Sequence, residues 1–264
     1  MPTSRDSLSE EAVVATLRAA GCVFAEDEAR LLISSARDRP ELADMVRRRA
    51  SGLPLEHVLG WVEFAGTRIV VEPGVFVPRR RTEFLVQQAA LVAPQGRRPV
   101  VVVDMCCGSG AIGVVLASKL GGVDLHAVDI DPVAVRCARR NVEPLGGHVY
   151  QGDLDAPLPT ALLGRVDLLV ANAPYVPSEA LGLLPPEARV YEPRVALNGG
   201  ADGLDVVRRV VAAAARWLAP SGHVLFETSE RQAPIAAGVV AGHGLTPTVA
   251  TSEELGATVM IGSR

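Results

Sequence analysis

Several features that would quickly classify a protein are scarce in this sequence of 264 residues. Only one of its 26 basic residues is a lysine, Lys119, and no C-x-x-C pair is present. The four cysteines follow no regular spacing: Cys22, Cys106, Cys107 and Cys137. This disfavours a structural zinc site and a disulfide scaffold. The best candidate for a membrane span, residues 210–215, ends at Arg216, far short of the roughly 20 apolar residues that a bilayer requires.

A leader and an excess of basic charge are also missing. The opening residues, MPTSRDSLSEE, contain no apolar core of a secretory signal. Since unpaired cysteines suit a reducing compartment, we expect a cytoplasmic protein without membrane contact. The net charge of −4 disfavours a protein that mainly neutralises nucleic-acid phosphates, so no sequence-specific nucleic-acid binding is expected. A hydrophobic content of 48% excludes disorder as the main state.

The first fifty-five residues are predicted to be helical. Ser7-Leu-Ser-Glu10 has the pattern of a capping box, and further helices are predicted over residues 26–36 and 41–50. The triplet Arg47–Arg49 closes the last of them, where positive charge suits the helix dipole. We interpret residues 1–55 as a substrate-recognition domain and these arginines as a place where a protein partner could dock.

Two further parts follow the helical region. Residues 56–80 are expected to form a β-hairpin linker, because apolar residues alternate around the turn Ala65-Gly66. A strand–helix–strand pattern then predicts an α/β catalytic domain over residues 81–264. Seven strands are predicted, over residues 100–103, 123–128, 148–150, 166–171, 223–227, 245–250 and 258–261. Helices are predicted over residues 111–120, 132–141, 203–218 and 232–241. The turn before the last strand is too short for a parallel crossover, so we expect a Rossmann-like seven-stranded sheet whose last strand is antiparallel.

Acidic residues follow three consecutive predicted strands. Asp104-Met-Cys-Cys-Gly108-Ser-Gly110 joins the first strand to a helix, Asp129 ends the second strand and Asp153 follows the third. Ligands of open α/β sheets bind at this edge. The loop has only two glycines and begins with an acid, which suits a cationic adenosyl cofactor better than a pyrophosphate. A dinucleotide site and a tight turn without a ligand remain as alternatives.

The fourth strand runs into Asn172-Ala-Pro-Tyr175. With the loop and the acids above, this tetrapeptide resembles the class I S-adenosylmethionine-dependent methyltransferases that act on planar nitrogens. Residues 52–66, 77–86 and 191–204 are similar, more narrowly, to the protein-(glutamine-N5) methyltransferases, the HemK-type release-factor enzymes and their ribosomal-protein relatives. This resemblance covers nearly the whole chain.

The resemblance implies S-adenosylmethionine as the cofactor and, as the target, a glutamine in a protein such as a release factor or a ribosomal protein. The implied cofactor-binding residues are Asp104, Cys106, Cys107, Gly108, Ser109, Gly110, Asp129, Asp153, Leu154 and Asn172. The implied catalytic residues are Asn172, Ala173, Pro174 and Tyr175. The same four, with Arg79 and Glu192, are expected to contact the substrate. No metal is expected, since the five histidines form no ligand pair.

The chemistry of an amide target supports the same assignment. An amide nitrogen is a poor nucleophile because its lone pair is delocalised into the carbonyl group. Two acceptors, the side-chain oxygen of Asn172 and the backbone carbonyl of Ala173, could orient that nitrogen by holding its N–H groups, and Tyr175 could stack on the planar amide. Catalysis would then come from positioning and desolvation rather than from a general base.

The chain departs from the family pattern at several positions. Ala173 replaces the first proline of the usual Asn-Pro-Pro-Tyr, and Cys106 stands where a glycine is usual. Arg80-Arg81 replace a Pro-Glu pair, which reverses the charge of a segment that could border the substrate. Glu192 and Glu227 could also bound the site, although a helix cap or a solvated carboxylate is the commoner role.

Two other functions stay open at the level of sequence. One is N-methylation of a small molecule or a nucleobase, since Asn-x-Pro-Tyr tetrapeptides also serve exocyclic amines. The other is a non-catalytic module that binds S-adenosylmethionine, in which the changes at Cys106 and Ala173 would reflect lost activity.

Overall fold

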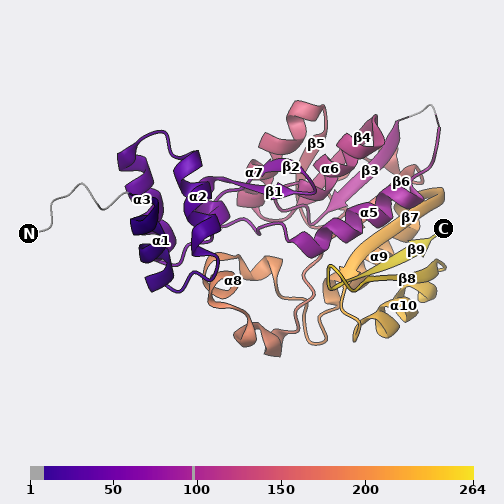
Figure 1. Cartoon of the computed structure of the whole chain (residues 1–264). Coiled ribbons are helices and arrows are strands. Elements are labelled where there is room, and N and C mark those ends of the chain that lie inside the picture. Colours follow the sequence, from indigo (N-terminus) through magenta and orange to yellow (C-terminus); the bar gives the residue numbers. More distant parts are fainter. Residues whose placement is uncertain (1–8, 97–98) are drawn as a thin grey trace, which may run out of the picture.

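The computed structural model describes residues 9–96 and 99–264. Four helices form the N-terminal part: α1 (Glu10–Ala19), α2 (Ala25–Ser35), α3 (Arg39–Ala50) and the short α4 (Leu55–Leu59). Figure 1 shows α1–α3 gathered at one end of the molecule. Ser9, whose Oγ accepts from Ala12 N at 3.3 Å, caps α1, and Glu10 is its first residue. The predicted capping-box register is therefore wrong, and its Ser7 lies outside the described residues.

The predicted hairpin is confirmed as β1 (Trp61–Phe64) and β2 (Thr67–Val70). Its turn residues Ala65 and Gly66 have φ values of 50° and 75°, as a two-residue turn between antiparallel strands requires. Val70 exchanges hydrogen bonds of 2.9 Å with the Asn141 side chain on α7, so the hairpin is fastened to the sheet domain. The division of the chain at residues 55 and 80 stays a prediction.

The seven-stranded sheet has the order β5-β4-β3-β6-β7-β9-β8. Its strands are β3 (Val100–Met105), β4 (Val123–Asp129), β5 (His148–Gln151), β6 (Val166–Ala171), β7 (Leu218–Thr228), β8 (Thr246–Ser252) and β9 (Ala257–Ser263). The pairs from β5 to β7 are parallel, whereas β9 runs antiparallel to both β7 and β8. The predicted fold class, with its antiparallel last strand, is thus confirmed.

Helices cover both faces of the sheet. They are α5 (Glu83–Val92), α6 (Ala111–Leu120), α7 (Pro132–Val142), α9 (Asp205–Trp217) and α10 (Ala233–Gly242), with a 3-10 turn at Arg80–Thr82 before α5. The short α8 (Pro186–Tyr191) lies apart from the sheet, beside the N-terminal helices (Figure 1). One core lies among α5, α6, α7 and the sheet, and the other lies among α9, α10 and the opposite face. The sequence analysis missed α4, α5 and α8. Among the described residues, no helix has the length and apolarity needed to cross a membrane.

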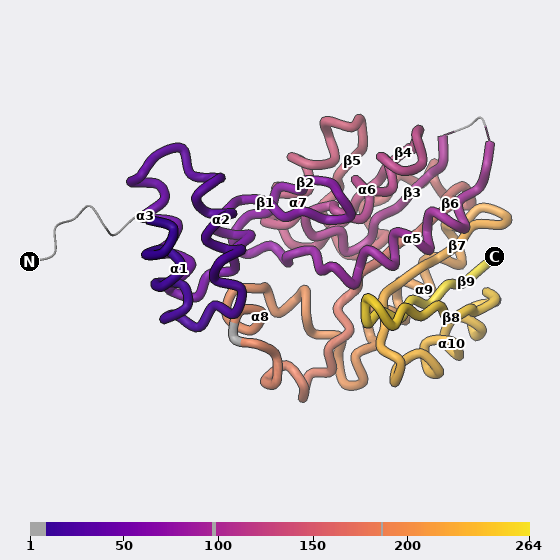
Figure 2. The backbone as a smooth tube through the Cα atoms, viewed as in Figure 1, coloured from indigo at the N-terminus to yellow at the C-terminus, as the bar shows by residue number. Residues whose placement is uncertain are grey.

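The N-terminal helices contact the segment around α8, and Figure 2 shows the two backbones side by side. Arg49 of α3 forms a buried ion pair with Glu28 of α2 (Nε–Oε2, 2.6 Å) and reaches Glu187 of α8 (Nη1–Oε1, 2.8 Å). Arg47 instead pairs with Asp44 on its own helix. The expectation of an arginine docking patch at Arg47–Arg49 is therefore wrong for Arg49, whose side chain is only 10% exposed and joins two parts of the fold.

Candidate active site

A cavity of about 590 Å³ opens beyond the carboxyl ends of the parallel strands. The predicted site residues in its wall are Arg79, Cys106, Cys107, Gly108, Ser109, Asp129, Asp153, Leu154, Asn172, Ala173, Pro174, Tyr175 and Glu192. These residues come from segments far apart in the sequence and meet because parallel strands end at the same edge of the sheet. Two predicted residues, Asp104 and Gly110, do not line the cavity.

Asp104 lies behind the loop rather than in the cavity wall. Its Oδ2 accepts from Gly113 N at 2.9 Å, which satisfies one of the free N–H groups in the first turn of α6. Burial, together with the nearby Asp129 carboxylate, raises the pKa of Asp104 to about 8. The sequence suggested a direct contact with the cofactor, whereas in the structure Asp104 is fully buried and does not line the cavity.

The loop after β3 turns through left-handed backbone conformations. Cys106, Gly108 and Gly110 have φ values of 59°, 56° and 77°. A side chain is disfavoured in this region, which explains why a glycine is usual at the position of Cys106. Gly110 is also needed for packing, because a Cβ there would lie 2.7 Å from Val142 Cγ2 on α7. Burial raises the pKa of the Cys106 and Cys107 thiols, so both stay protonated and behave as small apolar groups.

Asp129 lines the cavity and keeps hydrogen-bond acceptor capacity on both carboxylate oxygens. Its Oδ2 accepts from Gly108 N at 2.8 Å and its Oδ1 from Asp131 N at 2.9 Å. A carboxylate has about four acceptor positions, so each oxygen keeps one for a ligand. Burial raises the pKa of Asp129, although the two backbone donors oppose this shift. Asp153, at the end of β5, forms an ion pair of 2.7 Å with Arg209 of α9, which also lines the cavity.

These residues fit the adenosyl cofactor that the resemblance implies. Ser109 Oγ is buried in the cavity wall and has no partner within the described parts of the chain. Unpaired buried oxygens are costly, so they suit a ligand that donates hydrogen bonds. Asp129 and Asp153, the two acids of this edge that line the cavity, also favour a cationic ligand over a pyrophosphate.

The tetrapeptide after β6 is held by a buried carboxylate. Glu227, at the end of β7, accepts from the Tyr175 hydroxyl at 2.8 Å, from Arg81 Nε at 2.8 Å and from Thr82 Oγ1 at 2.7 Å. Asn172 Nδ2 in turn donates to Thr82 Oγ1 at 3.3 Å. Burial and the neighbouring Glu227 raise the pKa of Tyr175, so the phenol keeps the proton it donates.

Both glutamates singled out from the sequence are buried, so neither is the solvated carboxylate that was weighed against a place in the site. The Glu192 side chain is 1% exposed and pairs with Arg79, and that of Glu227 is 3% exposed and pairs with Arg81. Burial raises the pKa of Glu192, and Arg79 counteracts the shift. Arg81 thus supplies the positive charge that pairs with the buried Glu227 carboxylate, although the Arg81 side chain is itself partly exposed.

Comparison with known proteins decides the family. A family profile described as "Methyltransferase small domain" matches residues 66–183. A Geobacter sulfurreducens protein named release factor glutamine methyltransferase is 39% identical over 222 residues, which are 83% of this chain and 76% of that protein. The chain belongs to the release factor glutamine methyltransferase family. The resemblance drawn from the sequence is confirmed.

This member of the glutamine methyltransferase family is also similar to methyltransferases that are named for other substrates. A Streptomyces pristinaespiralis protein named 4-amino-L-phenylalanine/4-methylamino-L-phenylalanine methyltransferase is 37% identical over 198 residues, covering 73% of this chain and 67% of that protein. A solved T. thermophilus 16S rRNA N2 G1207 methyltransferase, in complex with AdoMet and guanosine, has a TM-score of 0.55 at 20% identity. It covers 77% of this chain and 49% of that chain, and the likeness shows the shared fold.

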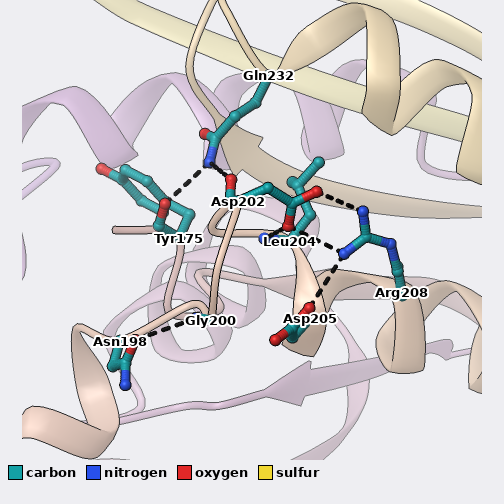
Figure 3. Close-up of polar contacts among 8 residues, drawn as sticks. All are labelled: Tyr175, Asn198, Gly200, Asp202, Leu204, Asp205, Arg208 and Gln232. Atoms are coloured by element: carbon teal, nitrogen blue, oxygen red, sulfur yellow. Dashed lines mark hydrogen bonds and ion pairs between the residues drawn. The ribbon is translucent and has the colours of Figure 1, made fainter. Parts of the chain in front are cut away.

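The loop of residues 199–203, to which the sequence analysis assigned no role, packs together with Gln232 against the backbone of the tetrapeptide. Figure 3 shows Gln232 Nε2 donating to the carbonyl oxygens of Tyr175 and Asp202, each at 3.0 Å. A Cβ on Gly199 would lie 2.7 Å from the Pro174 carbonyl oxygen, and one on Gly203 would overlap that of Tyr175. The glycines of residues 191–204, quoted above only for the resemblance, were the available signal for this close approach.

Proposed function

We propose that this protein transfers a methyl group from S-adenosylmethionine to the side-chain amide nitrogen, N5, of a glutamine in a protein substrate such as a release factor. One observation carries the proposal: Asp129 and Asn172–Tyr175, at the ends of β4 and β6, line the same cavity. A cofactor site and an amide-binding tetrapeptide thereby meet in one space. The proteins named release factor glutamine methyltransferase that match most of the chain support it.

The residues of the chain divide the work of binding the cofactor. Asp129 would accept hydrogen bonds from the two ribose hydroxyls, and Asp153 would accept one from the adenine amino group. Ser109 would accept a hydrogen bond from a donor group elsewhere on the cofactor. The turn from Cys106 to Gly110 brings backbone close to the ligand. When bound, S-adenosylmethionine supplies an electrophilic methyl group on a positively charged sulfur.

The tetrapeptide would hold the nucleophile. Asn172 Oδ1 and the Ala173 carbonyl accept the two N–H groups of the target amide, which orients its nitrogen and favours the pyramidal form with an available lone pair. Tyr175, held by Glu227 and Arg81, stacks on the amide plane. Most of the rate enhancement then comes from orientation in a water-poor cavity.

The experiment that tests this proposal is a labelling assay. The purified enzyme is incubated with isotopically labelled S-adenosylmethionine and a lysate from a strain that lacks the gene, and the labelled site is located by mass spectrometry. Label on a glutamine of a release factor or ribosomal protein is the expected result. Cofactor binding by calorimetry without transfer to any protein, RNA or metabolite would instead indicate a non-catalytic module.

A second candidate is N-methylation of a free aromatic amine. The relative named for 4-amino-L-phenylalanine is about as similar to this chain as the release-factor enzymes are. Ala173 also departs from the usual family tetrapeptide at the place where the target is expected. 4-Amino-L-phenylalanine, added to the same assay without lysate, separates the two, because label on this compound alone would replace the protein substrate by a small molecule.

Replacing Asp129 by alanine is expected to weaken the binding of S-adenosylmethionine by about 1.5–3 kcal/mol, the usual cost of losing a charged hydrogen-bond acceptor. Calorimetric dissociation constants check this. Asp124→Ala is the matched control, since Asp124 lies on the same strand outside the cavity and should leave binding unchanged. Equal affinities of wild type and Asp129→Ala would show that the ribose contact is misassigned.

Ala173→Pro is expected to preserve methyl transfer. The backbone carbonyl remains in place, and Pro174 already biases residue 173 towards an extended backbone. Steady-state rates of methyl transfer measure the effect. Because Ala173 is only 1% exposed, the melting temperature checks whether the proline ring fits at this buried position. A collapse of the rate in a variant with an unchanged melting temperature would show that the alanine side chain is itself required.

A further inference from the structure

The amide group of Asn172 is connected to a buried carboxylate through one hydroxyl group. Thr82, which is 2% exposed, donates from Oγ1 to Glu227 Oε2 at 2.7 Å. The same Oγ1 accepts from Asn172 Nδ2 at 3.3 Å. Three residues from three distant segments therefore form a short chain of hydrogen bonds that ends in the cavity wall.

The direction of this chain follows from the number of protons available. Glu227, paired with Arg81 at 2.8 Å, is a carboxylate and can only accept. The Thr82 hydroxyl has one proton, which it donates in the hydrogen bond to Glu227. The Thr82 oxygen can therefore only accept a hydrogen bond from Asn172. Asn172 must then direct its NH2 group to Thr82, and its Oδ1 is left to accept from the substrate.

We propose that Thr82 and Glu227 are positioning residues that fix the orientation of the Asn172 amide and thereby make the site select an N–H donor over an oxygen acceptor. The inference rests on the proposed function, in which Asn172 Oδ1 and the Ala173 carbonyl hold a target amide. Two converging acceptors match the NH2 group of glutamine. They repel a glutamate of nearly the same shape, which presents only acceptors.

Nothing else in the described surroundings distinguishes the two ends of the Asn172 amide. Its only recorded side-chain hydrogen bond is the one to Thr82. Without that hydroxyl the amide group can turn over, and a turned Asn172 would present NH2 to the target. This NH2 group would face the NH2 group of a glutamine unfavourably and could donate to the carboxylate of a glutamate. The preference of the site for glutamine over glutamate would therefore become smaller.

The test compares Thr82→Val with Thr82→Ser. Valine keeps the shape and removes the hydroxyl, whereas serine keeps the hydroxyl. The substrate is the release factor labelled by the wild-type enzyme in the assay above, and the competitor is the same protein with its target glutamine replaced by glutamate. The measured quantities are kcat, KM, the inhibition constant of the glutamate form, the dissociation constant of S-adenosylmethionine and the melting temperature.

In Thr82→Val we expect kcat to fall about ten-fold or more and the ratio of the inhibition constant to KM to fall as well, with unchanged cofactor affinity. Thr82→Ser should restore both quantities. If Thr82→Val does not fold, Glu227→Gln tests the direction of the hydrogen-bond chain instead. A glutamine amide at position 227 can donate to the Thr82 oxygen, and the Thr82 hydroxyl can then donate its own proton to Asn172 Oδ1. A wild-type ratio in a folded Thr82→Val or Glu227→Gln variant, or a Thr82→Ser variant as impaired as Thr82→Val, overturns the inference. A wild-type enzyme that methylates no glutamine overturns the proposed function and this inference with it.

Discussion

Replacing Asn172 by alanine is expected to reduce methyl transfer by about 10² to 10³-fold, the size of effect seen when one preorganised hydrogen-bonding group is removed from an active site. The side-chain acceptor is lost, so one N–H of the target amide has no protein partner in the cavity. The backbone acceptor of Ala173 alone cannot set the direction of the nitrogen lone pair. Single-turnover rates with labelled S-adenosylmethionine measure the effect on the transfer step.

The same variant should remain folded, because Asn172 contributes one side-chain hydrogen bond, of 3.3 Å, to the described structure. Thermal melting and circular dichroism verify this. Ser178→Ala is a suitable control: it removes a hydrogen bond of 2.8 Å to Asn198 in a neighbouring loop and leaves the cavity wall intact. A folded Asn172→Ala enzyme that transfers methyl groups at the wild-type rate would contradict the role assigned to Asn172.

The ends of the parallel strands were predictable because the relevant signals are local. A run of β-branched residues such as Val100–Val103 identifies a strand buried on both faces, and the polar residue that follows it lies at the sheet edge. Asp129 and Asn172 were placed correctly in this way. Asp104 was not, because its side chain turns to the first turn of α6, which depends on a contact with Gly113.

The ion pairs that the two buried glutamates of the site form could not be predicted from local patterns. Arg79 and Glu192 are 113 residues apart, and Arg81 and Glu227 are 146 residues apart, so their pairing depends on the completed fold. α5 was missed for a different reason. Its polar side consists only of Glu83, Gln87 and Gln88 and also includes the exposed apolar Leu91, so the alternation that marks an amphipathic helix is weak in the sequence.

These pairs change how the departure at Arg80-Arg81 is understood. From the sequence, a reversed charge near the substrate put the identity of that substrate in question. In the structure, Arg81 forms an ion pair with Glu227, which also accepts hydrogen bonds from Thr82 and Tyr175. The arginine therefore balances a charge inside the protein, and its removal would leave a buried carboxylate unpaired.

The loop behind the tetrapeptide leads to the largest expected effect on stability. Gly203 has a φ of 79°, and a Cβ built there overlaps the Tyr175 carbonyl oxygen and the Gln232 side chain. We expect Gly203→Ala to lower the free energy of unfolding by about 2–4 kcal/mol, of which roughly 1 kcal/mol comes from the left-handed backbone and the rest from the displaced neighbours. Methyl transfer should fall too, because the shift moves the backbone of Tyr175.

Gly244→Ala separates the two contributions. Gly244 has nearly the same φ, 76°, but no heavy atom lies within 4 Å of an added Cβ. This control should therefore lose only about 1 kcal/mol and keep its activity. Denaturant unfolding of both variants measures the difference directly. Equal losses of stability in the two would mean that the close approach of residue 203 to Tyr175 adds no cost beyond that of the left-handed backbone, and would contradict the close packing assigned to this glycine.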